Sequence, residues 1–179
     1  MLIAFNKPYQ VLSQFTDPNQ RQTLANFIDL PDVYAIGRLD YDSEGLLLLT
    51  DDGQLKHQLA HPKQKVNKVY LVQVEGVARK PSLDLLRKGI ELKDGIAKAV
   101  SVQLQLKQPA FVWKRNPPIR QRKNIPTSWV EIVINEGRNR QVRRMMAHVG
   151  LPVLRLIRTQ IGDFKLGDLP GGKYQIINP

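Results

Sequence analysis

Asp40 is the side chain in this sequence whose position most clearly suggests chemistry. It directly follows an apolar run and lies in the acidic segment GRLDYDSEGLLLLTDDG, which holds five carboxylates in a chain of formal net charge +11. A carboxylate at the end of a buried strand needs a cation or hydrogen-bond donors, or it takes up a proton and becomes neutral. Carboxylates in such surroundings are typical of active sites, where they act as bases or nucleophiles. Asp40 is therefore a candidate catalytic residue.

The other four carboxylates of this segment have simpler explanations. Asp42 and Glu44 flank Ser43 in an expected loop, where water would solvate them. Asp51 and Asp52 precede a glycine, which is typical turn chemistry at the end of a strand. We expect these four side chains to need no more than loop and turn solvation.

The sequence EGRNRQVRRM is the most informative basic motif, with Arg138, Arg140, Arg143 and Arg144 around an expected helix start. On a helical wheel the last three lie within about 100° of one another, opposite an apolar stripe of Met and Val. Lysine and glutamate would serve a solvated face equally well, but this face uses only arginine. Because the rigid guanidinium fork suits phosphates and buried carboxylates, the motif favours an anionic partner over simple solvation.

Basic residues are concentrated in one part of the chain. Residues 1–60 hold four Lys/Arg against eight Asp/Glu, whereas residues 61–179 hold twenty-three against eight. The proline-rich stretch KRNPPIRQRKNIPTSW adds five of these cations within 114–123, near two tryptophans. It is either a loop that contacts RNA or an exposed loop without specific contacts. Basic segments interleaved with Pro, Trp and strand-like runs favour nucleic acid over a membrane as the partner.

Several classes of function are excluded or disfavoured by what the chain lacks. It has no cysteine, so disulfides, thiolate metal sites and cysteine nucleophiles are absent, which fits a cytoplasmic protein. His57 and His61 have helical spacing, but Gln58 stands where a zinc protease has glutamate, so we expect no metal. We find no glycine-rich phosphate loop, no other cofactor motif, no transmembrane run and no signal peptide.

The expected elements are short strands and a few helices that do not alternate as βαβ units. Strands are expected over LIAFNK, GLLLLT, KVYLVQVE and WVEIVI, and helices over GQLKHQLAH, PSLDLLRK and NRQVRRMMAH. The stretch ELKDGIAKAV resembles a hairpin around KDG. This mixture predicts an α+β fold with a mostly antiparallel mixed sheet and flanking helices.

Several separated segments together resemble the pseudouridine synthases of the small-ribosomal-subunit-enzyme (RsuA) type. GRLDYDSEGLLLLTDDG is similar to the catalytic signature of this family, and FNKP, KVYLVQVEG and EGRNRQVRRM are similar to its other motifs, in order. Further stretches resemble the family's enzymes for large-subunit ribosomal RNA. The resemblance implies a catalytic fold with a central cleft, in which a uridine base detaches from its ribose, turns and rejoins through a ring carbon without a cofactor.

The resemblance also assigns roles to single residues. Asp40 matches the catalytic aspartate, which either attacks the anomeric carbon or abstracts the neighbouring ribose proton. Tyr70 matches the tyrosine that stacks on the target base and assists proton transfer. Arg143 matches the basic residue that pairs with the aspartate and keeps it ionised. Arg38 is a candidate for holding the extruded nucleotide. The side chains expected to contact RNA are Lys7, Arg38, Arg115, Arg120, Arg138, Arg140 and Arg144.

The resemblance leaves the organisation of the chain as an expectation. Relatives often carry a small RNA-binding domain before the catalytic domain, and this sequence reaches FNKP almost at once. Either the basic stretch 114–123 replaces that domain, or an N-terminal extension precedes this sequence. We expect a single catalytic domain over 1–179, acting as a monomer in the cytoplasm. The alternative is a catalytically silent ribosome-binding or assembly factor that keeps the RNA surface of the fold.

Overall fold

The computed structural model describes residues 1–120 and 122–177, which divide into two compact units. The first unit comprises Met1–Val66 and the residues from Ile157 onward, and the second unit comprises Asn67–Leu156. Strand β9, Val153–Ile161, contains the boundary between them. The single domain predicted over 1–179 is not tested by this division and stays a prediction.

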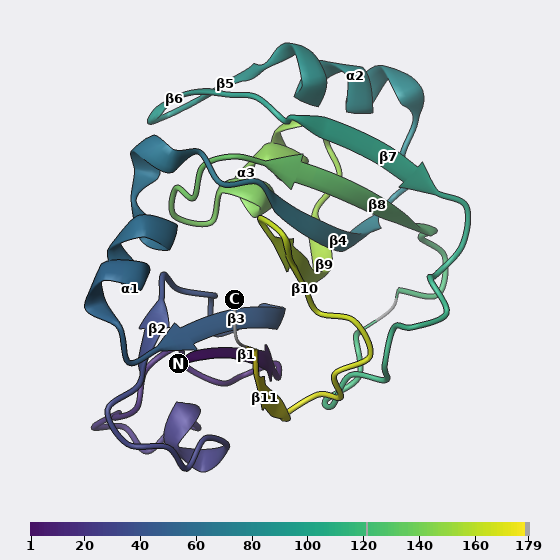
Figure 1. The fold of residues 1–179 in the computed structure, drawn as a ribbon. Coiled ribbons are helices and arrows are strands. Elements are labelled where there is room, and N and C mark those ends of the chain that lie inside the picture. The colour runs from purple at the N-terminus through teal and green to yellow at the C-terminus, as the bar shows by residue number, and fades with distance from the viewer. Residues whose placement is uncertain (121, 178–179) are drawn as a thin grey trace. The chain divides into compact units, whose positions relative to one another are not determined.

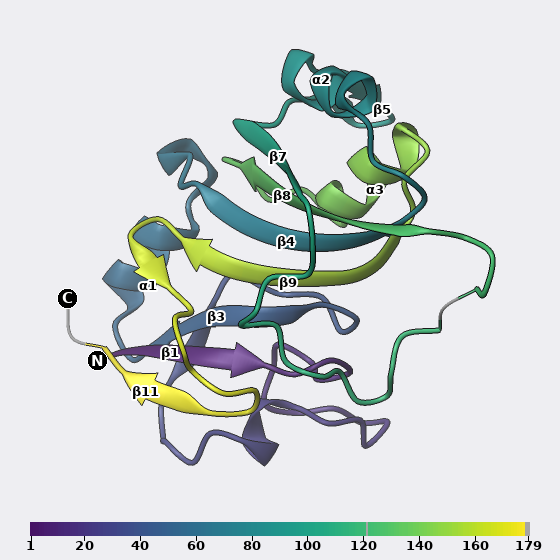
Figure 2. The same cartoon turned by 90° about the vertical axis from the view of Figure 1, so that its right-hand side faces the viewer.

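The first unit is built around a small sheet. Its elements are β1 (Leu2–Lys7), η1 (Leu24–Asn26), β2 (Tyr34–Ile36), β3 (Glu44–Thr50), α1 (Gly53–Ala60), η2 (Pro62–Gln64), β10 (Phe164–Lys165) and β11 (Tyr174–Ile176). Strand β1 pairs antiparallel with both β11 and β3, so the three strands lie side by side (Figures 1 and 2). Strand β2 also pairs antiparallel with β3, whereas β3 pairs with β9 in parallel.

Strands β1 and β3 are buried along their whole length. One face packs into a core with Leu24, Ile28, Val33 and Leu39, which come from the segment between the two strands. A buried, continuous apolar run such as LLLL therefore forms a central strand and not an alternating edge strand.

Gly45 permits the parallel pairing of β3 with β9. It lies opposite Arg158 and has φ +105°, a conformation that L side chains rarely adopt. A Cβ atom at this position would overlap the backbone carbonyl of Arg158. Only glycine fits both the dihedral angle and the close approach of the two backbones.

The second unit carries a three-stranded antiparallel sheet under two helices. Its elements are β4 (Lys68–Glu75), α2 (Lys80–Lys88), β5 (Ile90–Leu92), β6 (Gly95–Ala97), β7 (Ser101–Gln105), β8 (Thr127–Ile134) and α3 (Gln141–His148). The strand order of this sheet is β4, β8, β7, and the hairpin β5–β6 lies apart from it (Figure 1).

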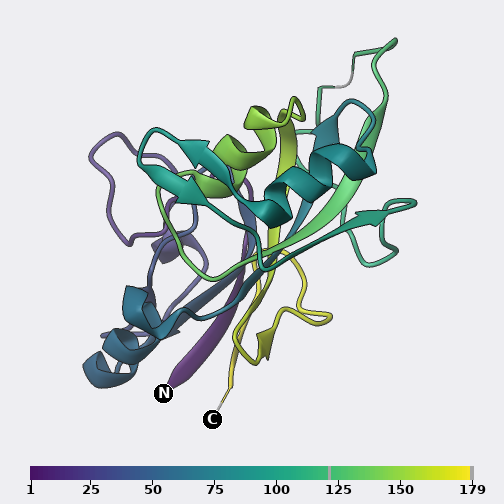
Figure 3. The ribbon, with the colours of Figure 1, turned by 90° about the horizontal axis from the view of Figure 1, so that it is seen from above.

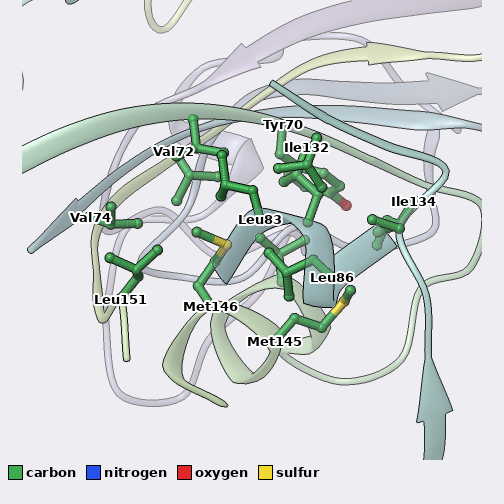
Figure 4. Packing of buried hydrophobic residues seen from close by; sticks show 14 of the residues in the cluster. Tyr70, Val72, Val74, Leu83, Leu86, Ile132, Ile134, Met145, Met146 and Leu151 are labelled. Atoms are coloured by element: carbon green, nitrogen blue, oxygen red, sulfur yellow. The ribbon is translucent and has the colours of Figure 1, made fainter. Parts of the chain in front are cut away.

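One face of this sheet and both helices share a hydrophobic core (Figure 4). Tyr70, Val72 and Val74 alternate along β4 and point into it, as the sequence predicts. Leu83 and Leu86 of α2 pack into the same core, together with the predicted apolar stripe of α3. The α+β class with mixed, mostly antiparallel pairing is confirmed.

We predict that Gly45→Ala destabilises the protein. Backbone strain should cost about 1 kcal/mol and the overlap with Arg158 a further 1–3 kcal/mol, measured as the free energy of unfolding in urea. The control is Gly53→Ala at the first position of α1, where an added Cβ meets no atom within 4 Å. This control should keep or slightly raise stability. Equal stability of the two variants would contradict the role of Gly45.

Candidate active site

Asp40 lies in the first unit, in the loop that joins β2 to β3, and its side chain is partly buried. The backbone N–H of Ser43 donates to the carbonyl oxygen of Asp40 at 3.0 Å and closes a tight turn. Leu39, directly before it, is only 5% exposed and belongs to the core of the first unit. The residue directly before Asp40 is therefore fixed in the core.

Hydrogen bonds from the segment after β1 hold the Asp40 loop on both sides. The hydroxyl of Ser13 accepts from the N–H of Leu39 at 3.0 Å and donates to its carbonyl at 2.5 Å. On the other side, the N–H of Gln10 donates to the carbonyl of Tyr41 at 2.8 Å. The residues before and after Asp40 are thus both tied to one short stretch of chain.

Two buried cations support this arrangement. Arg158 of β9 donates through Nε to the carbonyl of Leu46 at 2.8 Å and through Nη1 to that of Arg38 at 3.5 Å. Lys7 donates through Nζ to the carbonyls of Pro8 and Val11, each at 2.8 Å. The first cation braces the Asp40 loop where it leaves β2 and enters β3, and the second shapes the turn that carries Gln10.

Lys7 is inside the protein, with no exposed surface. Burial of its ammonium lowers its pKa to about 7, although the nearby carboxylates of Glu44, Asp42 and Asp40 act to raise it. The predicted RNA contact of Lys7 is untested and stays a prediction, but its Nζ already has two internal acceptors. The structure gives this side chain a supporting position beside the acidic segment, opposite Gly45.

The expectation that Glu44 is a solvated loop residue is wrong. Glu44 is the first residue of β3 and only 1% exposed. It acts on the buried ammonium of Lys7, which favours the charged form of that lysine. Glycine follows Glu44 and four leucines follow that glycine, so the strand and its burial begin earlier than the loop interpretation assumed. The turn interpretation suits Asp52, whose carboxylate caps α1 by accepting from the N–H groups of Gln54 and Leu55.

Tyr70 lies in the second unit, in the middle of β4. Its ring is 8% exposed and packs beside Ile132, its cross-strand neighbour on β8 (Figure 4). Burial in a close-packed core holds the ring in one orientation, which a side chain that contacts a base would need.

Arg143 lies on α3, partly buried beside the apolar stripe of that helix. Arg140 departs from the helical-wheel prediction, because it is the residue that precedes the helix and has a left-handed backbone (φ +51°). Its backbone is not helical, so the helical wheel does not place its side chain with those of Arg143 and Arg144.

Arg138 and Arg144 are held within the second unit by the turn of the β5–β6 hairpin, which lies beside α3 (Figure 3). Arg144 donates to both carboxylate oxygens of Asp94, at 2.8 and 2.9 Å. Arg138 donates to the same carboxylate at 3.0 Å and to the carbonyl of Ile96 at 2.9 Å. The hydrogen bonds from Arg144, with the charges of both arginines, lower the pKa of Asp94 to about 2.

Asp94 was missed at the sequence level because KDG was interpreted only as a hairpin turn. The structure shows a second use for that carboxylate, as the anchor of two arginines from the basic motif. Their predicted RNA contacts are untested, and any phosphate would meet guanidinium groups that are already oriented by Asp94.

Two arginines also anchor the proline-rich basic stretch. Arg115 donates to the carbonyls of Pro117 at 2.9 Å and Leu154 at 3.3 Å. Arg155 donates to the carbonyl of Trp113 at 2.8 Å, and its guanidinium lies 5.5 Å from the centroid of the Trp113 ring. Cations of this stretch with exposed side chains are Lys114, Arg120, Arg122 and Lys123. Arg38, in the first unit, is exposed as well.

The histidine pair forms no metal cluster. The rings of His57 and His61 lie 5.0 Å apart, and Nδ1 of His61 accepts from the N–H of Lys63 at 3.2 Å. Over 1–120 and 122–177, no group of three or more His, Cys, Asp or Glu side chains could hold a metal ion. Within the same residues, no helix is long and apolar enough to cross a membrane.

The predicted catalytic residues fall in both units: Asp40 in the first, Tyr70 and Arg143 in the second. The expected pairing of Arg143 with Asp40 stays a prediction. Within the first unit, the structure holds the loop of Asp40 on its hydrogen-bonded supports; within the second, it brings Arg138 and Arg144 together around Asp94.

The family model described as RNA pseudouridylate synthase matches residues 1–148. The chain belongs to this family, which confirms the family resemblance and the prediction that it is a pseudouridine synthase, an isomerase acting on RNA. A crystal structure of a pseudouridylate synthase matches 99% of this chain and 70% of its own, with a TM-score of 0.79 and 30% identity. A chain from an H/ACA RNP bound to a substrate RNA shares only the fold, with a TM-score of 0.63 and 14% identity over 92% of this chain and 48% of that one.

Curated relatives are similar over nearly the whole chain. The ribosomal large subunit pseudouridine synthase E of Vibrio parahaemolyticus is 55% identical over 98% of this chain and 73% of its own. The protein with the same name in Xanthomonas campestris is 51% identical over 98% of this chain and 95% of its own. The ribosomal large subunit pseudouridine synthase B of Bacillus subtilis is 36% identical over 97% of this chain and 66% of its own.

We predict that Lys7 makes stability depend on pH. Its pKa is near 7 in the folded state and 10.5 when unfolded, so between these values the unfolded chain binds more protons and stability rises with pH. Relative to Lys7→Met, the wild-type protein should gain at most about 1.4 kcal/mol per pH unit above pH 7. Urea unfolding at pH 6, 7, 8 and 9 measures this difference. Lys63→Met, at an exposed lysine, should keep the wild-type slope; the same slope in Lys7→Met would contradict the prediction.

Proposed function

We propose that this chain converts a specific uridine of large-subunit (23S) ribosomal RNA to pseudouridine. Two relatives that are 55% and 51% identical carry the name of large-subunit enzymes, and this chain aligns with them over 98% of its length. Its formal net charge of +11 suits a polyanionic substrate. Asp40 is the proposed catalytic carboxylate, and the observation that carries this assignment is its place in a loop held on both sides by hydrogen bonds.

The reaction balances without a cofactor. The bond between C1′ and N1 breaks, the base turns, and a bond between C1′ and C5 forms. The hydrogen on C5 leaves as a proton and N1 takes one up, so no oxidant, reductant or energy source is consumed. We propose that ionised Asp40 serves this exchange at the ribose, either as nucleophile at C1′ or as the base that removes the neighbouring ribose proton.

The second unit supplies the other proposed catalytic groups. Tyr70 is proposed to stack on the target base and to assist proton transfer. The buried packing of its ring supports this role, because a fixed ring loses little freedom when the base binds. Arg143 is proposed to keep Asp40 ionised during the reaction. Residues of both units fall within the part of the chain that the family model matches, which supports one catalytic domain over 1–179.

RNA binding is proposed to rest on exposed cations. Arg38 and Arg120 are exposed, and Arg140 precedes α3 in an exposed position. Arg115 anchors the basic stretch 114–123, which we propose takes part in binding the RNA. The relatives named above come from bacteria, where ribosomal RNA is made and assembled in the cytoplasm, and we infer that this protein acts there. We also propose that it acts as a monomer.

Asp40→Asn should abolish catalysis, because the amide keeps the shape of the carboxylate but is neither base nor nucleophile. The measurement is tritium release from large-subunit ribosomal RNA labelled at C5 of uridine, with an expected loss of at least about 10³-fold. Asp51→Asn is the matched control, since Asp51 pairs with the N-terminal ammonium at the other end of β3. A wild-type protein that releases no tritium from any ribosomal RNA would support the silent binding factor instead.

Neutralising the exposed cations of the basic stretch should weaken RNA binding in a salt-dependent way. In the variant, Lys114, Arg120, Arg122 and Lys123 become Gln, while the anchoring Arg115 is kept. A plot of the logarithm of the association constant against the logarithm of the salt concentration has a negative slope. The magnitude of this slope should decrease by about 0.7–0.9 for each phosphate that the variant no longer neutralises. The control replaces four exposed lysines of the first unit: Lys56, Lys63, Lys65 and Lys165. Equal slopes in the two variants would show that binding follows net charge and not this stretch.

A further inference from the structure

We propose that Ser13 is a positioning residue for catalysis, whose hydroxyl sets the orientation of the peptide group that carries Asp40. The inference rests on the proposed function of Asp40 and assigns a second residue to the same reaction. Ser13 lies outside the acidic segment, 26 residues away from Leu39 in sequence, and belongs to the segment that follows β1.

The two hydrogen bonds of Ser13 act on the backbone on either side of one residue. Its Oγ accepts from the N–H of Leu39 at 3.0 Å and donates to the carbonyl oxygen of Leu39 at 2.5 Å. That carbonyl belongs to the peptide bond between Leu39 and Asp40. Because this bond is planar, fixing its oxygen also fixes the plane that contains the N and Cα atoms of Asp40.

The hydroxyl itself is held by a rigid frame. Leu12 and Gln14, the neighbours of Ser13, are both hydrogen-bonded to a second segment: the N–H of Leu12 donates to Gln22, and the carbonyl of Gln14 accepts from Leu24, each at 2.9 Å. Thr23, between those two partners, caps the short helix η1. Ser13 is 8% exposed, so water does not readily replace its hydrogen bonds. These hydrogen bonds therefore fix the position of Ser13, and Ser13 in turn fixes the backbone at Leu39.

A hydroxyl is the side chain that can perform this task. It accepts one hydrogen bond and donates another from a single atom, and both Leu39 groups are buried and need partners. Alanine would leave those two polar groups without the hydroxyl, and the peptide group could rotate to seek other partners. A shift of about 1 Å at a reacting carboxylate is enough to cost about 10²-fold in rate.

Thr50 provides a matched control for a purely structural effect. Its hydroxyl also accepts from a backbone N–H, that of Asp52 at 3.0 Å, and donates to a backbone carbonyl, that of Met1 at 2.6 Å. It is fully buried and lies at the opposite end of β3 from the Asp40 loop. Thr50→Val therefore removes the same kind of hydrogen bonds from the same unit without touching the Leu39–Asp40 peptide.

The experiment measures single-turnover tritium release at saturating enzyme, together with the dissociation constant for the RNA and the urea unfolding curve of each variant. Ser13→Ala should slow the reaction about 10- to 100-fold while the dissociation constant stays within about twofold. Ser13→Thr, which keeps a hydroxyl, should react within about threefold of wild type. Ser13→Cys keeps the size of the side chain but has weaker hydrogen bonds, and should lie between Thr and Ala.

Each outcome decides one proposal. A Ser13→Ala protein with a wild-type rate, beside an inactive Asp40→Asn, would overturn the role of Ser13 and leave that of Asp40 intact. An active Asp40→Asn would instead overturn the proposed function itself. Equal slowing in Ser13→Ala and Thr50→Val would mean that the loss is one of general stability, which also overturns the positioning role. If Ser13→Ala does not fold, Ser13→Cys against Ser13→Thr makes the same decision, and equal rates in those two would contradict the inference.

Discussion

The first unit depends on one constraint: two adjacent strands, β1 and β3, are buried along their whole length, yet a charged residue ends one and begins the other. Lys7 lies opposite Gly45 in the register, next to the buried Glu44. Burial lowers the pKa of an ammonium group, and acceptors and opposite charge offset that effect only in part. Lys7 finds both, in two carbonyls of the following turn and in the carboxylates of the acidic segment. Lys7 therefore connects the conformation of that turn to the position of the segment that contains Asp40.

The second unit solves a different electrostatic problem. Its arginine motif brings several positive charges to one end of α3, where they repel one another and would move freely in water. The carboxylate of Asp94 gathers two of them and fixes the planes of their guanidinium groups. The acidic residue on the hairpin turn, with Glu136 as a second partner of Arg138 at 3.1 Å, thus orients these arginines in advance, which reduces the entropy that binding a phosphate would cost.

The sequence was a good guide to local structure. It was a weaker guide to which charged side chains are buried or paired. Alternation predicted the inward face of β4, and helical spacing predicted the apolar stripe of α3, because both patterns depend on neighbours in the chain. Glu44 and Asp94 were interpreted as loop and turn residues, since their partners are distant in sequence. Ser13 carried no signal at all: only the tertiary fold brings its hydroxyl to Leu39. Asp40 was found through its motif, and the segments that hold it became visible in the structure.

The order of the chain has a consequence for synthesis. The second unit is one continuous stretch, whereas the first needs strands that are made before it and after it: β11 pairs with β1, and the middle of β9 pairs with β3. As a chain emerges from the ribosome, the second unit can fold before these later strands exist. Arg158, which braces the Asp40 loop, is made 120 residues after Arg38, whose carbonyl it binds. A nascent chain therefore carries Asp40 long before that brace is in place, and the loop gains the brace only after the second unit has been made.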